Sequence, residues 1–246
     1  QQLLHPLQIK LIEYLSAAII VHAKFLRDIL IRDYGVDKKK IAVHPEGIID
    51  DLPVIDKNEA KKKLNLSGHV YLIIGSFVPA HGADIIVKHA KEIGKTILIV
   101  FNTNPNVYAR EVRLKFLKEV HEYVKFHKLG NIVRFDLRNV DSNLWRLYIC
   151  ASDLLLIPYR NSGISGSGPF AHAMSCLRPA IASNLPFFRE VLREFGCIAI
   201  AKNENDYAHV IKDAVNSKNL KRMTNEFKRY KNYYNFTMLG KRYKAL

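Results

Sequence analysis

From His69 onward the chain alternates short apolar segments with amphipathic ones, and this alternation restricts the fold more than any other feature. The apolar segments are "HVYLIIG" (69–75), "TILIVF" (96–101), "NIVRF" (131–135), "DLLLIP" (153–158), "PAIAS" (179–183) and "CIAIA" (197–201). Segments that are apolar on both faces are typical of strands covered by helices on both sides. Right-handed crossovers between such strands predict an α/β fold with a doubly wound parallel sheet, which is Rossmann-like.

Two of the intervening segments show helical periodicity. In "ADIIVKHAKEIG" the residues Ile86, Ala90 and Ile93 share one apolar stripe, and residues 108–130 are predicted to form a long amphipathic helix that ends at Gly130. Doubly wound sheets bind ligands at the carboxyl ends of their strands, so site residues are expected in the loops that follow strands.

The first 48 residues do not continue this repeat. They predict a helix at about 6–15, a strand at 17–23, a helix at 24–35 with Gly35 as its stop, and a strand at 40–47. Two strands and two helices are too few to bury a core of their own. We therefore interpret residues 1–48 as the end of a preceding domain, most of which is missing from a chain that begins at Gln1.

The chain of 246 residues carries a formal charge of +15, and its C-terminal part is strongly basic. From Lys218 onward nine Lys or Arg residues stand against the single acid Glu226. Such a surface attracts nucleic acid, an anionic membrane face or phosphorylated small molecules, unless it only provides solubility. The sequence has no apolar stretch near the ~20 residues of a membrane span and no pattern of a signal peptide.

The three cysteines are Cys150, Cys176 and Cys197, and their spacing indicates neither a disulfide framework nor a zinc site. We expect a cytoplasmic protein without a bound metal. The cysteines of apolar segments are expected to be small buried hydrophobic residues.

A glycine- and serine-rich turn, "NSGISGSGPFAHAM" (161–174), follows the fourth apolar segment. Pro169 suits the first turn of a helix, so the free amides of Ser165, Gly166, Ser167 and Gly168 are predicted to form a cradle for phosphate. The alternative is a tight turn whose glycines only supply positive φ. Residues 166–171 also match G-x-G-x-x-A, but the turn comes late and the next strand lacks the terminal acid that a nicotinamide site needs.

A second candidate loop, "IIGSFVPAHGAD" (73–84), follows the first apolar segment. Gly75 and Gly82 permit close backbone approach, and His81 is a candidate proton donor or cation beside the ligand. A lone histidine in a loop is more often a bystander, but His81 shares the predicted strand-end rim with the glycine-serine turn.

The order of these parts resembles the C-terminal half of the family-four retaining glycosyltransferases, which have two Rossmann-like domains in the GT-B fold. Residues 17–48, ending in "KIAVHPEGI", are similar to the end of that family's N-terminal domain, and residues 72–90 are similar to its G-R-x-x-x-x-K-G loop and helix. Residues 141–183 and "FFREVL" match its Y-x-x-A-D, A-M-x-C-x-x-P and E-V motifs, and "FTMLGKRYKAL" resembles its closing helix.

The resemblance implies four parts, which are the end of an acceptor domain (1–48), a linker (49–66), a nucleotide-sugar-binding domain (67–231) and a C-terminal crossover helix (232–246). It also implies transfer of a sugar with retention from a nucleotide-diphosphate donor to a glycan or lipid-linked acceptor. No metal or other cofactor is expected. A fragment of this kind is expected to need its missing N-terminal domain for activity, and its basic face is compatible with an anionic membrane surface.

Two charged pairs of the family are replaced in this chain. The two glutamates around the glycine-rich turn correspond to Ile164 and His172, and the Arg and Lys that clamp the diphosphate fall near Ser76 and His81. We therefore assign catalytic roles to His172, near the ribose, and to His81.

The expected donor-binding residues are Gly75, Ser76, His81, Arg138, Arg160, Ser165, Gly166, Ser167 and Gly168. Arg138 is expected near the nucleobase or the diphosphate, and Arg160 beside the leaving group. The alternative function is a non-catalytic Rossmann-like module that binds a partner or nucleic acid through its basic face, although no nucleic-acid-binding motif is present.

Overall fold

The computed structural model describes residues 5–49, 54–101, 110–138, 140–161 and 163–244. Its larger part is a six-stranded parallel sheet with the order β5-β4-β3-β6-β7-β8. The strands are β3 (Val70–Ile74), β4 (Thr96–Val100), β5 (Val133–Asp136), β6 (Leu154–Ile157), β7 (Ala180–Ser183) and β8 (Ile198–Ala201). Each coincides with one of the six predicted apolar segments, although β5 extends one residue beyond its segment to Asp136, and the predicted α/β fold with a parallel sheet is confirmed.

The strand order reverses between β3 and β6. From β3 the chain proceeds outward through β4 to β5, then returns to β6 beside β3 and proceeds outward on the other side to β8. A crevice opens at such a reversal, outside the carboxyl ends of the two central strands. This topology alone places the loops after β3 and β6 next to each other.

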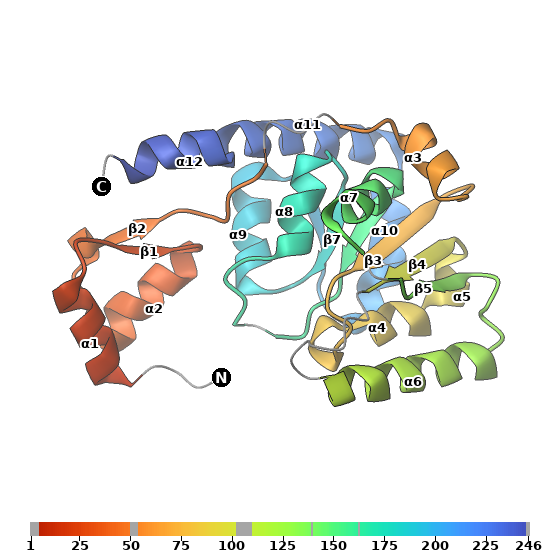
Figure 1. Cartoon of the computed structure of the whole chain (residues 1–246), viewed down its shortest axis with the longest axis horizontal. Coiled ribbons are helices and arrows are strands. Elements are labelled where there is room, and N and C mark those ends of the chain that lie inside the picture. Colours follow the sequence, from red (N-terminus) through yellow and green to blue (C-terminus); the bar gives the residue numbers. More distant parts are fainter. Residues whose placement is uncertain (1–4, 50–53, 102–109, 139, 162, 245–246) are drawn as a thin grey trace.

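Helices cover both faces of the sheet (Figure 1). One layer contains α4 (Ala83–Lys88), α5 (Ala90–Ile93), α6 (Arg110–Phe126) and α10 (Tyr207–Ala214), and the other contains α3 (Lys57–Lys63), α7 (Ser142–Ala151), α8 (Gly168–Ser175), α9 (Pro186–Phe195) and α11 (Ser217–Tyr234). The core lies between these layers, where Leu72, Ile97, Leu155 and Ile181 are completely buried. Burial on both faces explains why the strands are continuously apolar.

Two helix predictions were wrong in detail. The predicted helix over 83–94 is divided at His89, whose amide bonds to the Ile86 carbonyl at 3.1 Å, and this tighter turn still keeps Ile86, Ala90 and Ile93 buried. The long helix α6 ends at Phe126 and not at Gly130, because Lys128 adopts the left-handed conformation (φ 54°) that ends it. Residues 108–109 of that prediction lie outside the described residues.

The first elements form a smaller unit of α1 (Pro6–Leu15), β1 (Ile19–Val21), α2 (Lys24–Tyr34), a 3₁₀ turn η1 (Lys38–Lys40) and β2 (Ile41–Val43). β1 and β2 pair in parallel as a separate two-stranded sheet, and Gly35 ends α2 with φ 61°, as predicted. The outer face of α1 is apolar and uncovered, since Leu7, Leu11, Tyr14 and Leu15 are 57–82% exposed. An amphipathic helix of this kind is normally buried against further structure.

The C-terminal helices connect the two units (Figure 1). α11 crosses the sheet domain, breaks at Asn235 and continues as α12 (Phe236–Tyr243) toward β1 and β2. At the break, the Ile48 amide donates to the Tyr234 carbonyl at 3.0 Å and the Phe236 amide donates to the Ile48 carbonyl at 3.1 Å. The predicted domain boundaries remain predictions, and residues 50–53 and 245–246 of the expected linker and closing helix lie outside the described residues.

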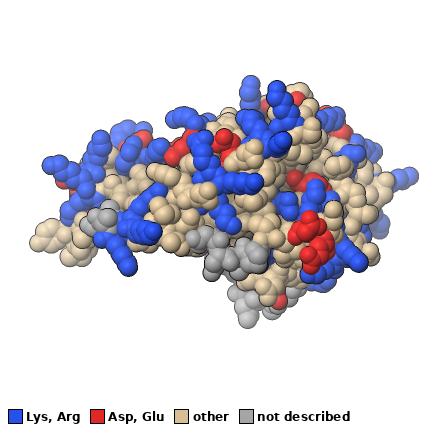
Figure 2. All heavy atoms as spheres, turned by 90° about the horizontal axis from the view of Figure 1, so that it is seen from above, with Lys and Arg blue, Asp and Glu red and all other residues tan. Residues whose placement is uncertain are grey.

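Among the charged side chains on the face formed by α11 and α12, Lys and Arg predominate over Asp and Glu (Figure 2). Tyr230 and Tyr234 of α11 are buried against Phe195, whereas Tyr233 is half exposed with the Arg242 guanidinium 4.1 Å from its ring centroid. The aromatic residues of this segment therefore divide between packing on the domain and facing outward.

Candidate functional site

The glycine-serine turn leads into the N-terminus of α8, directly after β6. Ser167 is the N-cap residue, and its Oγ accepts a hydrogen bond from the Phe170 amide at 3.3 Å. Pro169 occupies the first turn, as the sequence predicts. A serine cap and an early proline fix the position at which the helix begins. The free amides of its first turn therefore lie at the carboxyl ends of the strands.

The amides before α8 are available to a ligand. Within the described part of the chain, the amides of Ser165, Gly166, Ser167 and Gly168 have no hydrogen-bond acceptor. Neither Gly166 nor Gly168 has a positive φ, so these glycines are not there to relieve backbone strain. Free amides at the positive end of a helix favour an anion such as phosphate.

The loop after β3 packs directly against this turn. Gly75 has φ 135°, and a Cβ atom on it would lie 3.3 Å from Pro169 Cγ. Gly82, with φ 65°, lies so close to the carbonyl of Pro158 that a Cβ atom would overlap it. Both glycines permit close approach, as expected. In this structure the groups that lie against them are Pro169 and the carbonyl of Pro158, which belong to the protein and not to a ligand.

Tyr159 joins the two loops. Its ring stacks on His81 with 4.4 Å between centroids, and its hydroxyl lies 3.3 Å from Ser167 Oγ. Gly75, Ser76, His81, Tyr159 and Pro169 line one narrow pocket at this point. The structure thus brings together two loops that are more than 70 residues apart in the sequence.

His81 sits in a 3₁₀ turn, η2 (Pro79–His81), and its Nδ1 lies 2.7 Å from the Ser76 carbonyl. Because a carbonyl only accepts hydrogen bonds, Nδ1 carries the proton. Burial lowers the pKa of His81, and the nearby charge of Arg113 lowers it further, against the opposing effect of the Ser76 carbonyl. His81 is therefore neutral near pH 7, which makes it unsuitable as the fixed cation that the sequence suggested.

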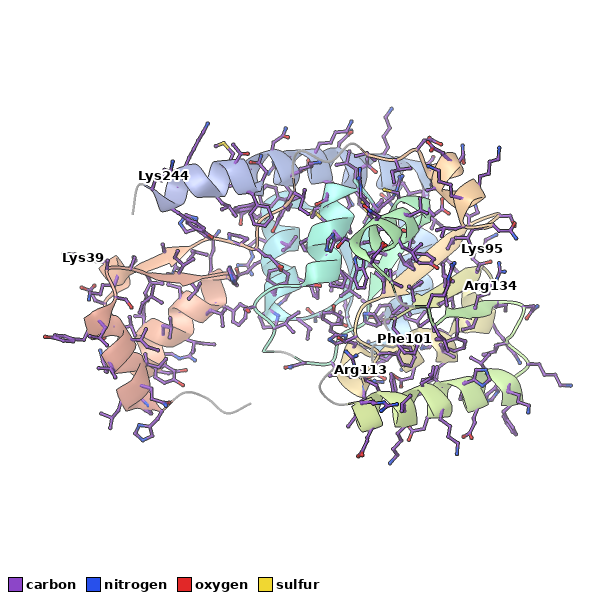
Figure 3. The ribbon with its side chains drawn as sticks, in the orientation of Figure 1. Lys39, Lys95, Phe101, Arg113, Arg134 and Lys244 are labelled. Carbon is purple, nitrogen blue, oxygen red and sulfur yellow. The ribbon has the colours of Figure 1, made fainter. Side chains whose placement is uncertain are left out.

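Arg113 is a residue that sequence reasoning missed. It comes from the N-terminal end of α6 (Figure 3). Its Nη2 donates to Ser76 Oγ at 2.8 Å. A cation thus reaches the loop after β3 from a neighbouring helix. The available signal was its place in the first turns of the helix that follows β4, because those turns also lie at the carboxyl edge of the sheet.

Two of the expected cations are engaged with carboxylates. Arg160 donates to both carboxylate oxygens of Asp84, at 2.7 and 2.9 Å, and to Glu204, which lies in η3 (Glu204–Asp206), at 2.8 Å. Arg138 donates to Asp136 at 2.6 Å and to the hydroxyl of Tyr148. These partners raise the pKa of each guanidinium and neutralise its charge locally. A diphosphate would have to compete with these carboxylates to bind either guanidinium.

Arg138 is also separated from the glycine-serine turn and from the loop after β3 by the order of the strands. It follows the edge strand β5, and β4 separates that strand from β3. The structure therefore brings Gly75, Ser76 and His81 together with the turn at residues 165–168, at the carboxyl ends of β3 and β6. Arg160 lies beside them in an ion-pair network. Arg138 lies away from them, in its own pair with Asp136.

His172 lies one turn into α8, with its ring centroid 6.0 Å from that of Trp145. Burial lowers its pKa, and the negative charge of Glu46 acts in the opposite direction. Glu46, which the sequence analysis did not select, precedes Ile48 and the contact with α11, and it extends over Gly166. Among the described residues, no group of three or more His, Cys, Asp or Glu side chains could hold a metal ion.

Known proteins share this architecture. No protein-family model matches the chain. Anabaena HepE, solved in complex with UDP, superposes with a TM-score of 0.78 at 15% identity over 97% of this chain. Sucrose-phosphate synthase from Thermosynechococcus elongatus superposes with a TM-score of 0.76 at 19% identity over 98% of this chain. The chain has an α/β fold with a parallel sheet that matches the domains of GT-B glycosyltransferases.

The GT-B relatives are longer than this chain. It spans 66% of the HepE chain and 62% of the synthase. An uncharacterized glycosyltransferase of Methanocaldococcus jannaschii is 23% identical over 157 residues, which are 63% of this chain and 40% of that protein. The described helices include none that is long and apolar enough to cross a membrane.

Proposed function

We propose that this chain is the nucleotide-sugar-binding half of a retaining glycosyltransferase. The observation that carries the proposal is the set of unpaired amides at Ser165–Gly168, at the start of α8 and at the carboxyl end of β6 where the strand order reverses. In doubly wound sheets this is the position of the ligand. The solved GT-B relatives with UDP and UDP-glucose support a nucleoside diphosphate as that ligand.

In glycosyl transfer, negative charge grows on the leaving diphosphate as the bond to the sugar breaks. Fixed amides and a helix N-terminus stabilise such charge without reorganisation. Arg113, held at Ser76 on the opposite side of the pocket, would supply the cation, while Gly75 lets the two loops close together. In this arrangement the chain's own groups neutralise the leaving group, and no metal is required.

His172 and His81 would act as neutral groups at physiological pH, because burial lowers the pKa of each. His172 would contact the ribose or the donor sugar, and His81 would orient the loop after β3 through Ser76. Retention of configuration rests on the resemblance of the motifs around α8. It would be tested by the anomeric configuration of the product.

The acceptor would be a glycan or a lipid-linked glycan held by an N-terminal domain. The apolar outer face of α1 and the two-stranded sheet β1-β2 support such a domain, because both are surfaces that further strands and helices would cover. The basic face of α11 and α12, with Tyr233 and Phe236 half exposed, supports contact with anionic lipid at the cytoplasmic side of a membrane.

Calorimetric titration with UDP, GDP and ADP, each free and as the glucose ester, tests the donor site. The decisive variant is Gly168→Asp, because position 168 has open space and an ordinary φ, so the new carboxylate changes the charge of the cradle without strain. Gly130→Asp is the matched control, since Gly130 is equally open and lies beyond α6. Binding of one nucleotide that disappears only in Gly168→Asp is the expected result.

Arg113→Gln should weaken the same binding about tenfold, as expected for loss of one charge-assisted phosphate contact. Absence of binding by all six nucleotides would contradict the proposal. Salt-dependent RNA or DNA binding that is equal in the wild type and Gly168→Asp would instead indicate a non-catalytic module that uses the basic face.

A further inference from the structure

Glu46 lies at the mouth of the phosphate cradle. A Cβ atom placed on Gly166 would be 3.0 Å from Glu46 Oε2 and 3.8 Å from Glu46 Cβ. Gly166 therefore leaves the space into which this side chain extends. Glu46 belongs to the segment between β2 and the sheet domain, so it approaches the cradle from a different part of the chain.

The backbone around Glu46 is fixed on both sides. Before it, the His44 amide donates to the Val21 carbonyl at 2.8 Å. After it, Gly47 packs under the ring of Phe236, where a Cβ atom would lie 2.5 Å from the ring, and Ile48 is hydrogen-bonded to the break between α11 and α12. The carboxylate is thus presented to the cradle by a rigid segment.

The charge of Glu46 is not neutralised locally. Within the described residues its carboxylate has no hydrogen bond and no ion pair, although the cradle amides are close by. Its charge acts on two neighbouring side chains. It raises the pKa of His172, which burial lowers, and it raises the pKa of Tyr159, which burial also raises. An uncompensated negative charge beside an anion site opposes the binding of negative ligands.

Donor and product of the proposed reaction differ in charge at this position. The terminal phosphate of a free nucleoside diphosphate has a second pKa of about 6, like other phosphate monoesters, so it is mostly doubly charged above pH 7. The same phosphate joined to a sugar carries one charge. A carboxylate at the cradle therefore repels the product more strongly than the donor, whatever the sugar is.

We propose that Glu46 is a specificity-determining residue that makes the cradle discriminate a nucleotide sugar from the nucleoside diphosphate left after transfer. This inference rests on the proposed function. This discrimination would favour release of the product. The repulsion between Glu46 and the terminal phosphate increases only when the sugar has left and the phosphate has gained its second charge.

The test compares the dissociation constants of UDP and UDP-glucose, GDP and GDP-glucose, and ADP and ADP-glucose for the wild type and Glu46→Gln. At pH 7.5, Glu46→Gln should tighten the binding of the free diphosphate by about threefold to tenfold, as one unit charge several ångströms away predicts, and should change the binding of the glucose ester less. At pH 5.5, where the terminal phosphate is mostly singly charged, the difference should shrink. Glu46 is exposed and unpaired in the described structure, so the variant should fold normally.

Glu92→Gln is the matched control, because Glu92 is an exposed carboxylate on α5, which leads into the opposite end of the sheet. It changes the net charge equally and should leave the ratio of the two dissociation constants unchanged. If the ratio of the dissociation constants of the free diphosphate and its glucose ester is the same in the wild type and in Glu46→Gln, this inference alone is overturned. Failure of every nucleotide to bind the wild type would overturn the proposed function and this inference with it.

Discussion

The carboxylate of Glu190 on α9 accepts a hydrogen bond from the backbone amide of Phe25 at 2.7 Å. It also accepts one from the neighbouring Lys24 amide at 2.8 Å, so a side chain of the sheet domain caps the first turn of α2. The N-cap residue of α2, Ala23, offers no capping side chain of its own. One carboxylate therefore satisfies two orphan amides and fixes the small N-terminal unit against the sheet domain.

Replacement of Glu190 by Ala should lower the free energy of unfolding by about 1–2 kcal/mol, as loss of an N-terminal cap does. Urea unfolding measures this change, and hydrogen exchange should show faster exchange of the Lys24 and Phe25 amides. Glu119→Ala is the control, since Glu119 is exposed in the middle of α6 and has no ion pair among the described residues. Equal effects of the two variants would contradict the capping role.

Asp153 predicts a specific sensitivity to acid. Its side chain is 7% exposed and accepts hydrogen bonds from Lys57 and Lys61, at 2.6 Å each, and from the Val70 amide at 2.9 Å. Burial raises the pKa of Asp153, but the two lysines and the amide outweigh it, so the pKa lies below the ordinary value of 3.8. Its contribution to stability is therefore complete above about pH 5 and is lost as the pH falls through the ordinary pKa of 3.8 and then through the lowered one.

Asp153→Asn should cost about 3 kcal/mol at pH 7, because it leaves two lysines beside an uncharged group. The difference from the wild type should narrow as the pH falls below about 5, because the carboxylate binds a proton first in the unfolded state and then, at its lowered pKa, in the folded state. Urea unfolding at several pH values measures both effects. A difference that is constant down to pH 2.5 would show that the charge of Asp153 is not responsible.

Gly82→Ala should be strongly destabilising. The residue has φ 65°, and a Cβ atom would overlap the carbonyl oxygen of Pro158. Strain of the left-handed backbone alone costs about 1–2 kcal/mol, and the overlap must push β6 and the loop after β3 apart. We expect a loss of more than about 2 kcal/mol in urea unfolding, whereas Gly130→Ala, in open space, should be nearly neutral. Similar stabilities of the two variants would exclude this close approach.

His81 should titrate below the ordinary histidine pKa of 6.5, because burial and then the charge of Arg113 lower its pKa. The folded state thus takes up its proton at lower pH than the unfolded state, and His81 destabilises the fold as the pH falls below about 6.5. Histidine NMR resonances, assigned by comparison with His81→Asn, report the midpoint. Arg113→Gln should raise that midpoint, and an unchanged midpoint would place the Arg113 charge too far from His81 to matter.

The architecture of the sheet domain follows from short segments of the sequence. Six segments that are apolar on both faces required a covered parallel sheet, and the glycine-serine turn, with Ser167 and Pro169 in suitable positions, required a helix N-terminus after β6. These are local properties, since each depends on the period of a short segment or on the φ and capping preferences of single residues. The end of α6 was not predictable in this way, because Lys128 adopts a conformation that a glycine would ordinarily supply.

The charges that meet at the cradle depend on contacts between distant parts of the chain. Arg113 reaches Ser76 from α6, Glu46 reaches Gly166 from the segment after β2, and Arg160 is drawn into pairs with Asp84 and Glu204. None of these pairs has a spacing that a helix or a strand would reveal, because each joins residues 37 to 120 positions apart. Electrostatic interactions depend on distance through space, and crossovers between layers of the fold set those distances.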